Sequence, residues 1–419
     1  MRTGRALAGR GQQSCLESAN VIVIADDILP RPDLGGRAAG MRAWGIGQGL
    51  EANGLRVFYA VRTRWWPQDQ PLPEPKPNEA YWSSPAELGR LLRRMKHGAI
   101  VNCSYPSILP AAVEDSLLIQ DSHGPRLIEG AFRNRCAAKL AAWRETTAYA
   151  KADYFICAGF RQQNYFYPWL ALSGFDLTET SRFLVVRFGY SETPPARRPV
   201  PKRLIFAGTL LPWTDPRSGW QIAAEEVQRV GGELLFITSA HPGDLASKFL
   251  TDALNAFRDS PRCRVMDKLP HEAYLRELSS ATAAIDVMQR NSERDLAFPT
   301  RTIEYLWAGV PPITYDYGEV GELVFRYNAG WATPPRDEAS IRSAVREALD
   351  RPGVTESKSK NAQYLHQTLL HPKVTTAPLA DVCRKGVKRR ERRRVSFPRV
   401  RGLLLRQVIA VLRRIEGVA

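Results

Sequence analysis

The chain has 419 residues, of which 44% are hydrophobic and 24% are charged, so it is globular in composition and too long for one ordinary core. Its net charge of +16 is uneven, because thirteen basic and two acidic residues lie between Arg384 and the end. This tail carries +11 and leaves only +5 for the first 383 residues, which argues against a nucleic-acid-binding body.

The first half of the chain alternates short apolar runs with helical patterns. These runs predict strands at residues 21–27, 55–61, 99–105, 116–124, 152–160 and 183–189. Helical patterns occupy residues 38–54 and 131–151. Near-continuous apolar strands separated by helices are typical of a parallel sheet covered on both faces. Residues 191–202 are rich in proline and polar, which predicts a linker.

The alternation restarts after the linker. Strands are predicted at residues 203–210, 232–240, 262–267, 283–288 and 311–316. Helices are predicted at residues 218–230, 269–281, 300–309, 318–330 and 337–350. The pattern predicts an α/β protein with two tandem doubly wound Rossmann-like domains, residues 16–195 and 200–350, facing across a ligand-binding cleft. A helical return segment, 351–383, and the tail, 384–419, follow.

The tail has the pattern of a basic amphipathic helix. One face carries Leu404, Val408, Val411, Leu412 and Ile415, and the opposite face carries Arg399, Arg406 and Arg413. Such a helix suits an anionic membrane surface, and the near absence of aromatic residues disfavours nucleic acid as its partner. A helix docked on the protein's own body would have the same pattern, so both interpretations stay open.

Cysteine use and hydropathy predict a cytoplasmic protein. No apolar run approaches the ~18 residues that a membrane-spanning helix needs, and the N-terminal segment lacks the apolar region of a secretory signal. Six scattered cysteines form no CxxC pair, which favours reduced thiols and disfavours a zinc site. We expect peripheral contact with the inner face of the membrane through the tail.

Two glycine-containing segments have the composition of phosphate-binding loops. The segment GIGQG, residues 45–49, lies inside a predicted helix about 20 residues past the first strand. A dinucleotide fingerprint would follow the strand at once, so these glycines predict close helix packing. Gly35 and Gly36 precede a predicted helix N-terminus, where bare N–H groups can approach phosphates. A plain flexible turn fits this pair equally well.

A carboxylate interrupts the apolar helix of the segment FPTRTIEYLWAG. Thr300 and Arg301 open this helix, so backbone N–H groups, the helix dipole and a guanidinium converge at a point suited to a diphosphate. Glu304 lies one turn later, where a carboxylate can accept hydrogen bonds from two vicinal hydroxyls such as those of ribose. The competing interpretation is an Arg–Glu surface pair worth only a few tenths of a kcal/mol.

Two more candidates rest on their position in the chain. His123 of DSHG ends a predicted strand at the expected cleft, and Arg217 stands at a helix start after the strand and loop FAGTLLPWTDP. A structural histidine and a surface arginine are the competing interpretations.

The motifs of the second domain, in their order, resemble the donor domain of GT-B fold glycosyltransferases, and specifically glycosyltransferase family 4. The similar features are FAG at 206–208, LPHEAYLRELSSATAAIDVM at 269–288 and PTRTIEYLWAGVPPITYDYGEVGELVFRYNAGW at 299–331. The resemblance covers roughly residues 20–350 and is diffuse in the first domain. It implies that Glu304 binds the donor ribose, that Arg301 contacts phosphate, and that His123 lies by the donor sugar.

The resemblance implies a retaining transfer of a sugar from a nucleotide diphosphate sugar to a glycan or lipid-linked acceptor. No metal is implied, because no Asp-x-Asp motif stands in the cleft. The implied catalytic residues are His123 and Arg301, and the implied donor-binding residues are Gly35, Gly36, Thr209, Arg217, Thr300, Arg301 and Glu304. Leu296 and Thr209 depart from the family's usual Glu and Arg, and Arg217 stands in for its usual Lys. A catalytically silent nucleotide-sugar or glycan-binding protein and an epimerase of the same fold therefore stay open.

Overall fold

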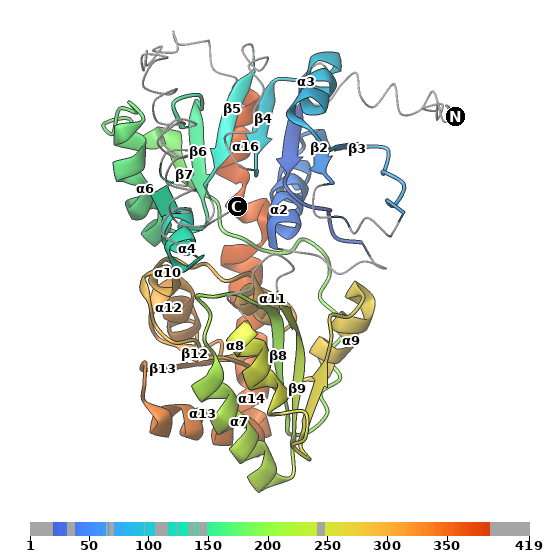
Figure 1. Cartoon of the computed structure of the whole chain (residues 1–419), viewed down its shortest axis with the longest axis vertical. Coiled ribbons are helices and arrows are strands. Elements are labelled where there is room, and N and C mark those ends of the chain that lie inside the picture. The colour runs from blue at the N-terminus through green and yellow to red at the C-terminus, as the bar shows by residue number, and fades with distance from the viewer. Residues whose placement is uncertain are drawn as a thin grey trace, which may run out of the picture.

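The computed structural model of the chain contains two parallel β-sheets, one in each of two domains stacked along the long axis (Figure 1). The structure describes residues 20–31, 38–63, 66, 71–95, 97–104, 116–122, 124–133, 138–139, 142, 149–240 and 248–385. Two tandem α/β domains are therefore confirmed for this part of the chain.

The first domain contains a seven-stranded sheet with the order β3-β2-β1-β4-β5-β6-β7, in which every neighbouring pair is parallel. Its strands are β1 Val21–Ala25, β2 Val57–Arg62, β3 Glu79–Trp82, β4 Ala99–Asn102, β5 Leu117–Asp121, β6 Tyr154–Cys157 and β7 Phe183–Val185. Its helices are α2 Ala38–Ala52, α3 Pro85–Arg94, α4 Arg126–Arg133 and α6 Phe160–Leu172, and a short 3₁₀ turn spans Thr180–Arg182. All five residues of β1 are fully buried, as expected for a central strand.

The second domain repeats this plan with the order β10-β9-β8-β11-β12-β13, again with parallel pairs throughout. Its strands are β8 Arg203–Leu210, β9 Glu233–Ala240, β10 Cys263–Met266, β11 Ala283–Asp286, β12 Pro312–Tyr315 and β13 Trp331–Thr333. Its helices are α7 Arg217–Val230, α8 Lys248–Asn255, α9 His271–Ser280, α10 Ser292–Leu296, α11 Thr300–Trp307, α12 Gly318–Arg326 and α13 Glu338–Asp350. The strand order reverses between β8 and β11, as it does between β1 and β4, and such switch points are where doubly wound sheets bind ligands.

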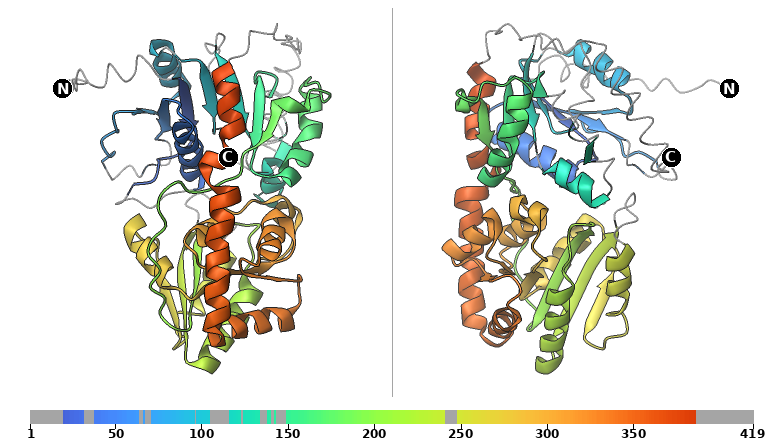
Figure 2. Two further views of the ribbon diagram at one scale, coloured as in Figure 1. Left: turned by 180° about the vertical axis from the view of Figure 1, so that it is seen from behind. Right: turned by 60° about the vertical axis from the view of Figure 1, so that its left-hand side comes forward.

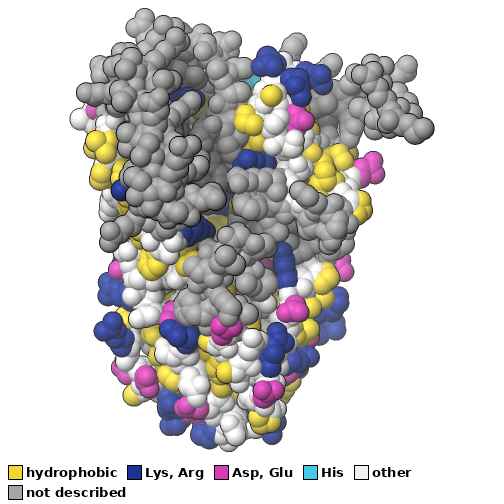
Figure 3. All heavy atoms as spheres, in the orientation of Figure 1, with side chains coloured by type: hydrophobic (Ala, Val, Ile, Leu, Met, Phe, Trp, Pro, Cys, Tyr) yellow, Lys and Arg dark blue, Asp and Glu magenta, His cyan; other side chains and the backbone are white. Residues whose placement is uncertain are grey.

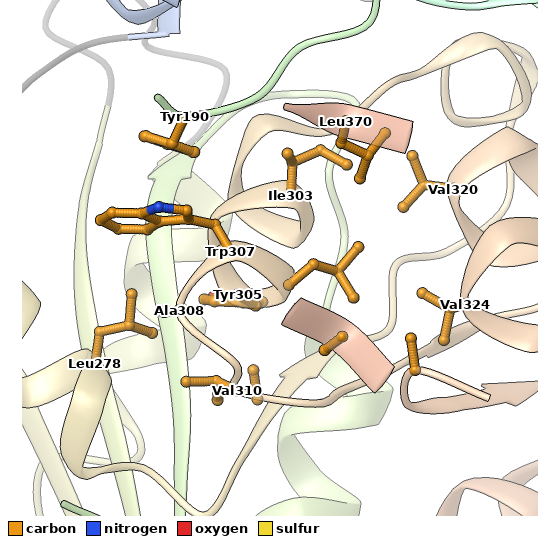
Figure 4. Packing of buried hydrophobic residues seen from close by; sticks show 14 of the residues in the cluster. Tyr190, Leu278, Ile303, Tyr305, Trp307, Ala308, Val310, Val320, Val324 and Leu370 are labelled. Atoms are coloured by element: carbon orange, nitrogen blue, oxygen red, sulfur yellow. The ribbon is translucent and has the colours of Figure 1, made fainter. Parts of the chain in front are cut away.

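The core beneath the second sheet holds the helix that carries the predicted donor site. Ile303, Leu306 and Trp307 of α11 are buried in one cluster with residues of α12 and of the return segment (Figure 4). The hydroxyl of Tyr305 donates to the carbonyl of Ala207 at 3.0 Å and accepts from its N–H at 2.8 Å. Because these bonds tie α11 to β8, the first turn of the helix is fixed at the carboxyl end of the central strand.

The return segment crosses from the second domain back to the first (Figure 2). It comprises α14 Pro352–Leu365, a π-helical turn His366–Leu370, α15 Pro372–Thr375 and α16 Ala377–Lys385. Helix α14 packs on α11, whereas α15 and α16 pack on α2. A Cβ added at Gly49 would lie 2.6 Å from the carbonyl oxygen of Pro372, and one at Gly45 would lie 2.9 Å from that of Gly189. The packing role predicted for the GIGQG glycines is therefore confirmed.

The distribution of surface charge, the length of the helices and the position of the tail all bear on the predicted contact with a membrane. Basic and acidic side chains are interspersed on the face of the second domain shown in Figure 3. None of the helices in the described ranges is long and apolar enough to span a bilayer. The predicted amphipathic helix falls within 386–419, outside the described residues, so its placement stays a prediction.

Candidate functional site

A cavity of about 210 Å³ lies between the domains at the carboxyl end of β8, and we call it the donor cavity. Its lining residues are Ala38, Met41, Tyr190, Ala207, Gly208, Thr209, Leu211, Ile237, Thr238, Lys268, Leu269, His271, Tyr274, Thr300, Arg301 and Glu304. The structure thus brings four of the predicted site residues, Thr209, Thr300, Arg301 and Glu304, to one cavity at the switch point. Their roles in ligand binding stay predictions.

Arg301 lies across the end of β8. Its Nη2 donates to the carbonyl of Thr209 at 3.2 Å, its Nε lies 3.7 Å from Oδ1 of Asp286, and its guanidinium covers the ring of Phe206 at 5.0 Å. Gly208 has φ +137°, and a Cβ added there would lie 3.1 Å from the guanidinium carbon. The positive φ therefore favours glycine at position 208, and the absence of a side chain there leaves room for the guanidinium.

One nitrogen of the Arg301 guanidinium has no hydrogen-bond acceptor among the described residues. The side chain is 12% exposed, and this nitrogen, Nη1, is buried. An unpaired buried donor is costly, and it is satisfied when a ligand oxygen arrives. Arg301 is the second residue of α11, and at a helix N-terminus the helix dipole and backbone N–H groups favour an anion.

Glu304 lies one turn along α11 and faces the same cavity. The hydroxyl of Tyr274 donates to its Oε2 at 2.7 Å, and the hydroxyl of Tyr190 also hydrogen-bonds the carboxylate. Burial raises the pKa of Glu304 to about 7, although both tyrosine hydrogen bonds act to lower it. The ion pair of Arg301 is with Asp286, so the alternative interpretation of an Arg301–Glu304 surface pair is wrong.

The polar residues of the cavity that the sequence analysis did not identify include Tyr190, Lys268 and Tyr274. Tyr190 comes from the segment before the linker, whereas Lys268 and Tyr274 come from the β10–α9 connection and from α9. The tyrosines could have been found only through the fold, because aromatic residues in apolar runs usually signal core. His271 at the start of α9 also lines the cavity, and burial lowers the pKa of its imidazole.

Arg217 lies elsewhere. It begins α7, its side chain is 53% exposed, and it is not among the residues that line the donor cavity. Its Nε and Nη2 donate to the two carboxylate oxygens of Asp215 at 2.9 and 2.7 Å. The sequence signal for this pairing was the aspartate two positions earlier. A donor-binding role for Arg217 stays a prediction that this geometry does not favour.

The remaining predicted residues, His123, Gly35 and Gly36, lie outside the described residues. The described residues that are near them in the sequence include a buried ion pair. The Nε and Nη2 of Arg42 on α2 donate to the two carboxylate oxygens of Asp121 at 3.1 and 2.9 Å, which fixes the end of β5. Within the described ranges, no group of three or more His, Cys, Asp or Glu residues could hold a metal ion.

Sequence comparison finds a partial match. No protein-family model matches the chain. Curated relatives include the glycogen synthases of two Mycobacterium tuberculosis strains, CDC 1551 and H37Rv, each 30% identical over 115 residues. The match spans 27% of this chain and 27% of each relative, so it covers about a quarter of their length.

Structural comparison covers nearly the whole chain. Sucrose-phosphate synthase from Thermosynechococcus elongatus has a TM-score of 0.61 at 16% identity, over 87% of this chain and 98% of that one. HepE from Anabaena, in complex with UDP and glucose, has a TM-score of 0.62 at 10% identity, over 87% and 99%. WaaG, a glycosyltransferase involved in lipopolysaccharide biosynthesis, has a TM-score of 0.58 at 12% identity, also over 87% and 99%. With its two parallel sheets in separate domains and its likeness to these structures over most of their length, this chain has the GT-B fold.

Proposed function

We propose that the protein is a glycosyltransferase that moves a sugar from a nucleotide diphosphate sugar to a glycan or lipid-linked acceptor. The observation that carries this proposal is the convergence of the α11 N-terminus, the unpartnered Nη1 of Arg301 and the carboxylate of Glu304 in one cavity. The glycogen synthase relatives and the UDP and glucose of the HepE complex support it.

In this proposal Arg301 and the start of α11 bind the diphosphate. Negative charge grows on the leaving diphosphate as the glycosidic bond breaks. A guanidinium and backbone N–H groups already aimed at that charge stabilise the transition state without reorganising. We propose that these groups act without a metal ion and that the sugar is transferred with retention, as the resemblance to family 4 implies.

Glu304 is proposed to bind the ribose. An ionised carboxylate has about four lone-pair sites, and two tyrosine hydroxyls leave about two for a vicinal diol. Tyr190 and Tyr274 would hold the carboxylate in one orientation while the ribose hydroxyls complete its hydrogen bonds. The distance along α11 from Arg301 to Glu304 is one helical turn, which matches the order diphosphate then ribose.

The proposal is tested by binding and turnover. The melting temperature of the purified protein is measured with UDP, GDP, ADP, CDP and dTDP. Glucose and other sugar conjugates of the nucleotide that raises the melting temperature are then tested as donors, with lipid extract and soluble glycans as acceptors. Formation of a glycosylated product with release of nucleoside diphosphate supports the transferase. Release of nucleoside diphosphate together with a free sugar that is inverted at one ring carbon, without an acceptor, indicates an epimerase, whereas a free sugar of unchanged ring configuration indicates hydrolysis of the donor. Failure of all nucleotides to bind overturns the proposal.

A second candidate is a catalytically silent nucleotide-sugar-binding protein. The family's first glutamate is replaced by Leu296, and both nearby carboxylates are engaged. Glu293 accepts two bonds from Arg294, at 2.5 and 2.9 Å, and Asp295 accepts one from Arg290 at 2.8 Å. Nucleotide binding without turnover of any conjugate would favour this second candidate.

We propose that the tail, residues 384–419, attaches the protein to anionic membrane. Each arginine near such a surface contributes ~1 kcal/mol, and apolar burial adds to it, so salt should weaken but not abolish binding. A chain ending at 385 should lose sedimentation with phosphatidylserine vesicles and keep turnover of soluble acceptors. Equal sedimentation of both proteins would contradict membrane attachment. Loss of folding would instead support a helix docked on the body.

A further inference from the structure

A second and larger cavity, of about 320 Å³, lies beside the linker, and we call it the hinge cavity. Its lining residues are Pro30, Arg31, Met41, Trp44, Gly45, Lys76, Gly189, Tyr190, Ser191, Glu192, Thr193, His271, Glu272, Leu275 and Trp307. Both domains and the linker contribute to it. Its volume falls at the lower end of the range of small-molecule sites, on the order of 300–1,000 Å³.

The hinge cavity is distinct from the donor cavity. The two share Met41, Tyr190 and His271, but Arg301 and Glu304 line only the donor cavity. The groups proposed to hold the diphosphate and ribose are therefore absent from the hinge cavity. A ligand of the hinge cavity must be recognised by other chemistry, and its binding does not depend on the proposed transferase activity.

Aromatic rings from both domains form the apolar part of the hinge cavity. Tyr190 and Trp307 stack with ring centroids 4.8 Å apart and planes 22° apart, and Figure 4 shows the indole next to Tyr190. The indole N–H of Trp307 already donates to the carbonyl of Glu192 at 2.9 Å. Trp307 therefore offers ring surface and not a donor, and Trp44 of α2 adds a second indole.

The charged groups of the hinge cavity are balanced. Arg31 donates to Glu79 at 2.6 Å and to the hydroxyl of Tyr81 at 3.0 Å. The ammonium of Lys76 lies 5.7 Å from the ring of Trp44. Burial raises the pKa of the Glu192 carboxyl overall, although backbone hydrogen bonds and the charge of Lys76 act to lower it. An anionic ligand would be repelled by the carboxylates of Glu192 and Glu272. A cationic ligand would be repelled by the basic side chains of Arg31 and Lys76.

These surfaces suit a neutral molecule with an apolar face and many hydroxyls. A sugar ring lays its C–H face on an aromatic ring while its hydroxyls donate to carboxylates and accept from ammonium groups. A wholly apolar ligand would leave the charged groups without hydrogen bonds, which is costly when they are desolvated. We propose that the hinge cavity is a second binding site whose ligand is a neutral carbohydrate.

A ligand of the hinge cavity would contact a residue that also serves the donor cavity. Tyr190 lines both cavities, and its hydroxyl hydrogen-bonds Glu304. Carbohydrate bound against its ring would therefore hold the tyrosine that orients the proposed ribose ligand.

The experiment is calorimetric titration of the full chain with neutral hexoses and disaccharides, with and without saturating UDP, alongside glucose 6-phosphate and glucosamine. We expect at least one neutral sugar to bind in the presence of UDP and to bind more tightly than the two charged sugars. Trp44→Ala should weaken its binding by about tenfold, because an aromatic platform is lost. The matched control, Trp169→Phe on α6, should leave it unchanged.

Glu192→Gln provides a second variant in the linker if Trp44→Ala fails to fold, and it should weaken sugar binding severalfold by replacing a carboxylate acceptor. The proposal is overturned if no neutral sugar binds, if UDP displaces the sugar, or if these variants bind it as the wild type does. UDP titration without sugar tests the donor site separately, so failure of one proposal is distinguishable from failure of the other.

Discussion

Two helices of the second domain, α7 and α11, carry an arginine in their first turn, and the two arginines differ in the acceptors that surround them. In α11, Arg301 is 12% exposed and keeps a buried nitrogen without a partner in the described structure. In α7, Arg217 is 53% exposed and bonds both oxygens of Asp215. A helix start with a basic residue is therefore the same sequence signal in both places. The local acceptor decides which arginine remains available to a ligand.

The largest expected effect separates the two arginines. Arg301→Ala should lower kcat by about 10²–10³, with a smaller change in donor KM, because the charge that it meets develops in the transition state. Arg217→Ala should change kcat by less than about threefold, since an exposed pair is worth little. Arg301→Lys should recover only part of the rate, because an ammonium lacks the planar fork.

Steady-state kinetics with the identified donor make the measurement. An equal loss in Arg217→Ala would break the comparison between the helices. A rise in KM alone for Arg301→Ala would show that this arginine binds substrate without stabilising the leaving group.

The next effect concerns the carboxylate one turn beyond Arg301. Glu304→Ala should weaken nucleotide binding by about 2–4 kcal/mol, because hydrogen bonds to a charge are worth ~1.5–3 kcal/mol each. Calorimetry measures this loss, and the exposed Glu356→Ala on α14 serves as the control. Unchanged nucleotide affinity in a folded Glu304→Ala protein would remove the ribose assignment.

The glycine beneath Arg301 gives a smaller effect. Gly208→Ala would place a Cβ at φ +137° and 3.1 Å from the guanidinium carbon, so it should lower the free energy of unfolding by about 1–3 kcal/mol and displace the arginine. Gly353→Ala is the control, because nothing lies within 4 Å of the added atom. Urea denaturation compares them, and equal stability of Gly208→Ala and wild type would contradict this strain.

The smallest effect is a pH dependence that again separates the two helices. Burial raises the pKa of Glu304 to about 7, so its ionised form is lost as pH falls through 7. If only that form binds ribose, nucleotide affinity should fall about tenfold between pH 8 and pH 6. The pKa of Asp215, which burial raises, is lowered overall by its hydrogen bonds from Arg217, so that pair should persist.

Stability should change with the opposite sign. A carboxyl whose folded pKa lies above its ordinary value favours the folded state at low pH, and this contribution is lost as pH rises through about 7. Glu304→Gln should therefore raise the melting temperature at pH 8 relative to wild type and have less effect at pH 5.

Both pH predictions depend on the titration of Glu304. A nucleotide affinity that is the same at pH 6 and pH 8 would show that this carboxylate does not titrate in this range.

The fold could be predicted because most strands are long apolar runs. All eleven predicted strands have counterparts, whereas β3 and β13 were missed. β3 begins with Glu79, a buried carboxylate that pairs with Arg31 and accepts from the backbone N–H of Lys76, and β13 has three residues. The helix predicted at 318–330 is α12, which ends earlier, at Arg326. The helix predicted at 131–151 overlaps α4, which starts earlier, at Arg126.

The candidate site was predictable where its residues share one helix. Arg301 and Glu304 are one turn apart, so helical spacing alone places them together. Tyr190 and Tyr274 reach the same carboxylate from other elements, and only tertiary packing brings them there. No local pattern distinguishes such tyrosines from core residues.

The chain crosses between its domains twice, once in the linker 191–202 and again in the return segment, where α14 packs on the second domain and α15 and α16 pack on the first. Any movement of one domain relative to the other has to be accommodated in both connections at once, because each of them joins the two domains. A single proteolytic cut in the linker would divide the chain into two fragments. Because the return segment belongs to the second fragment but packs on α2 of the first, this packing would be the non-covalent clasp that keeps the two fragments assembled.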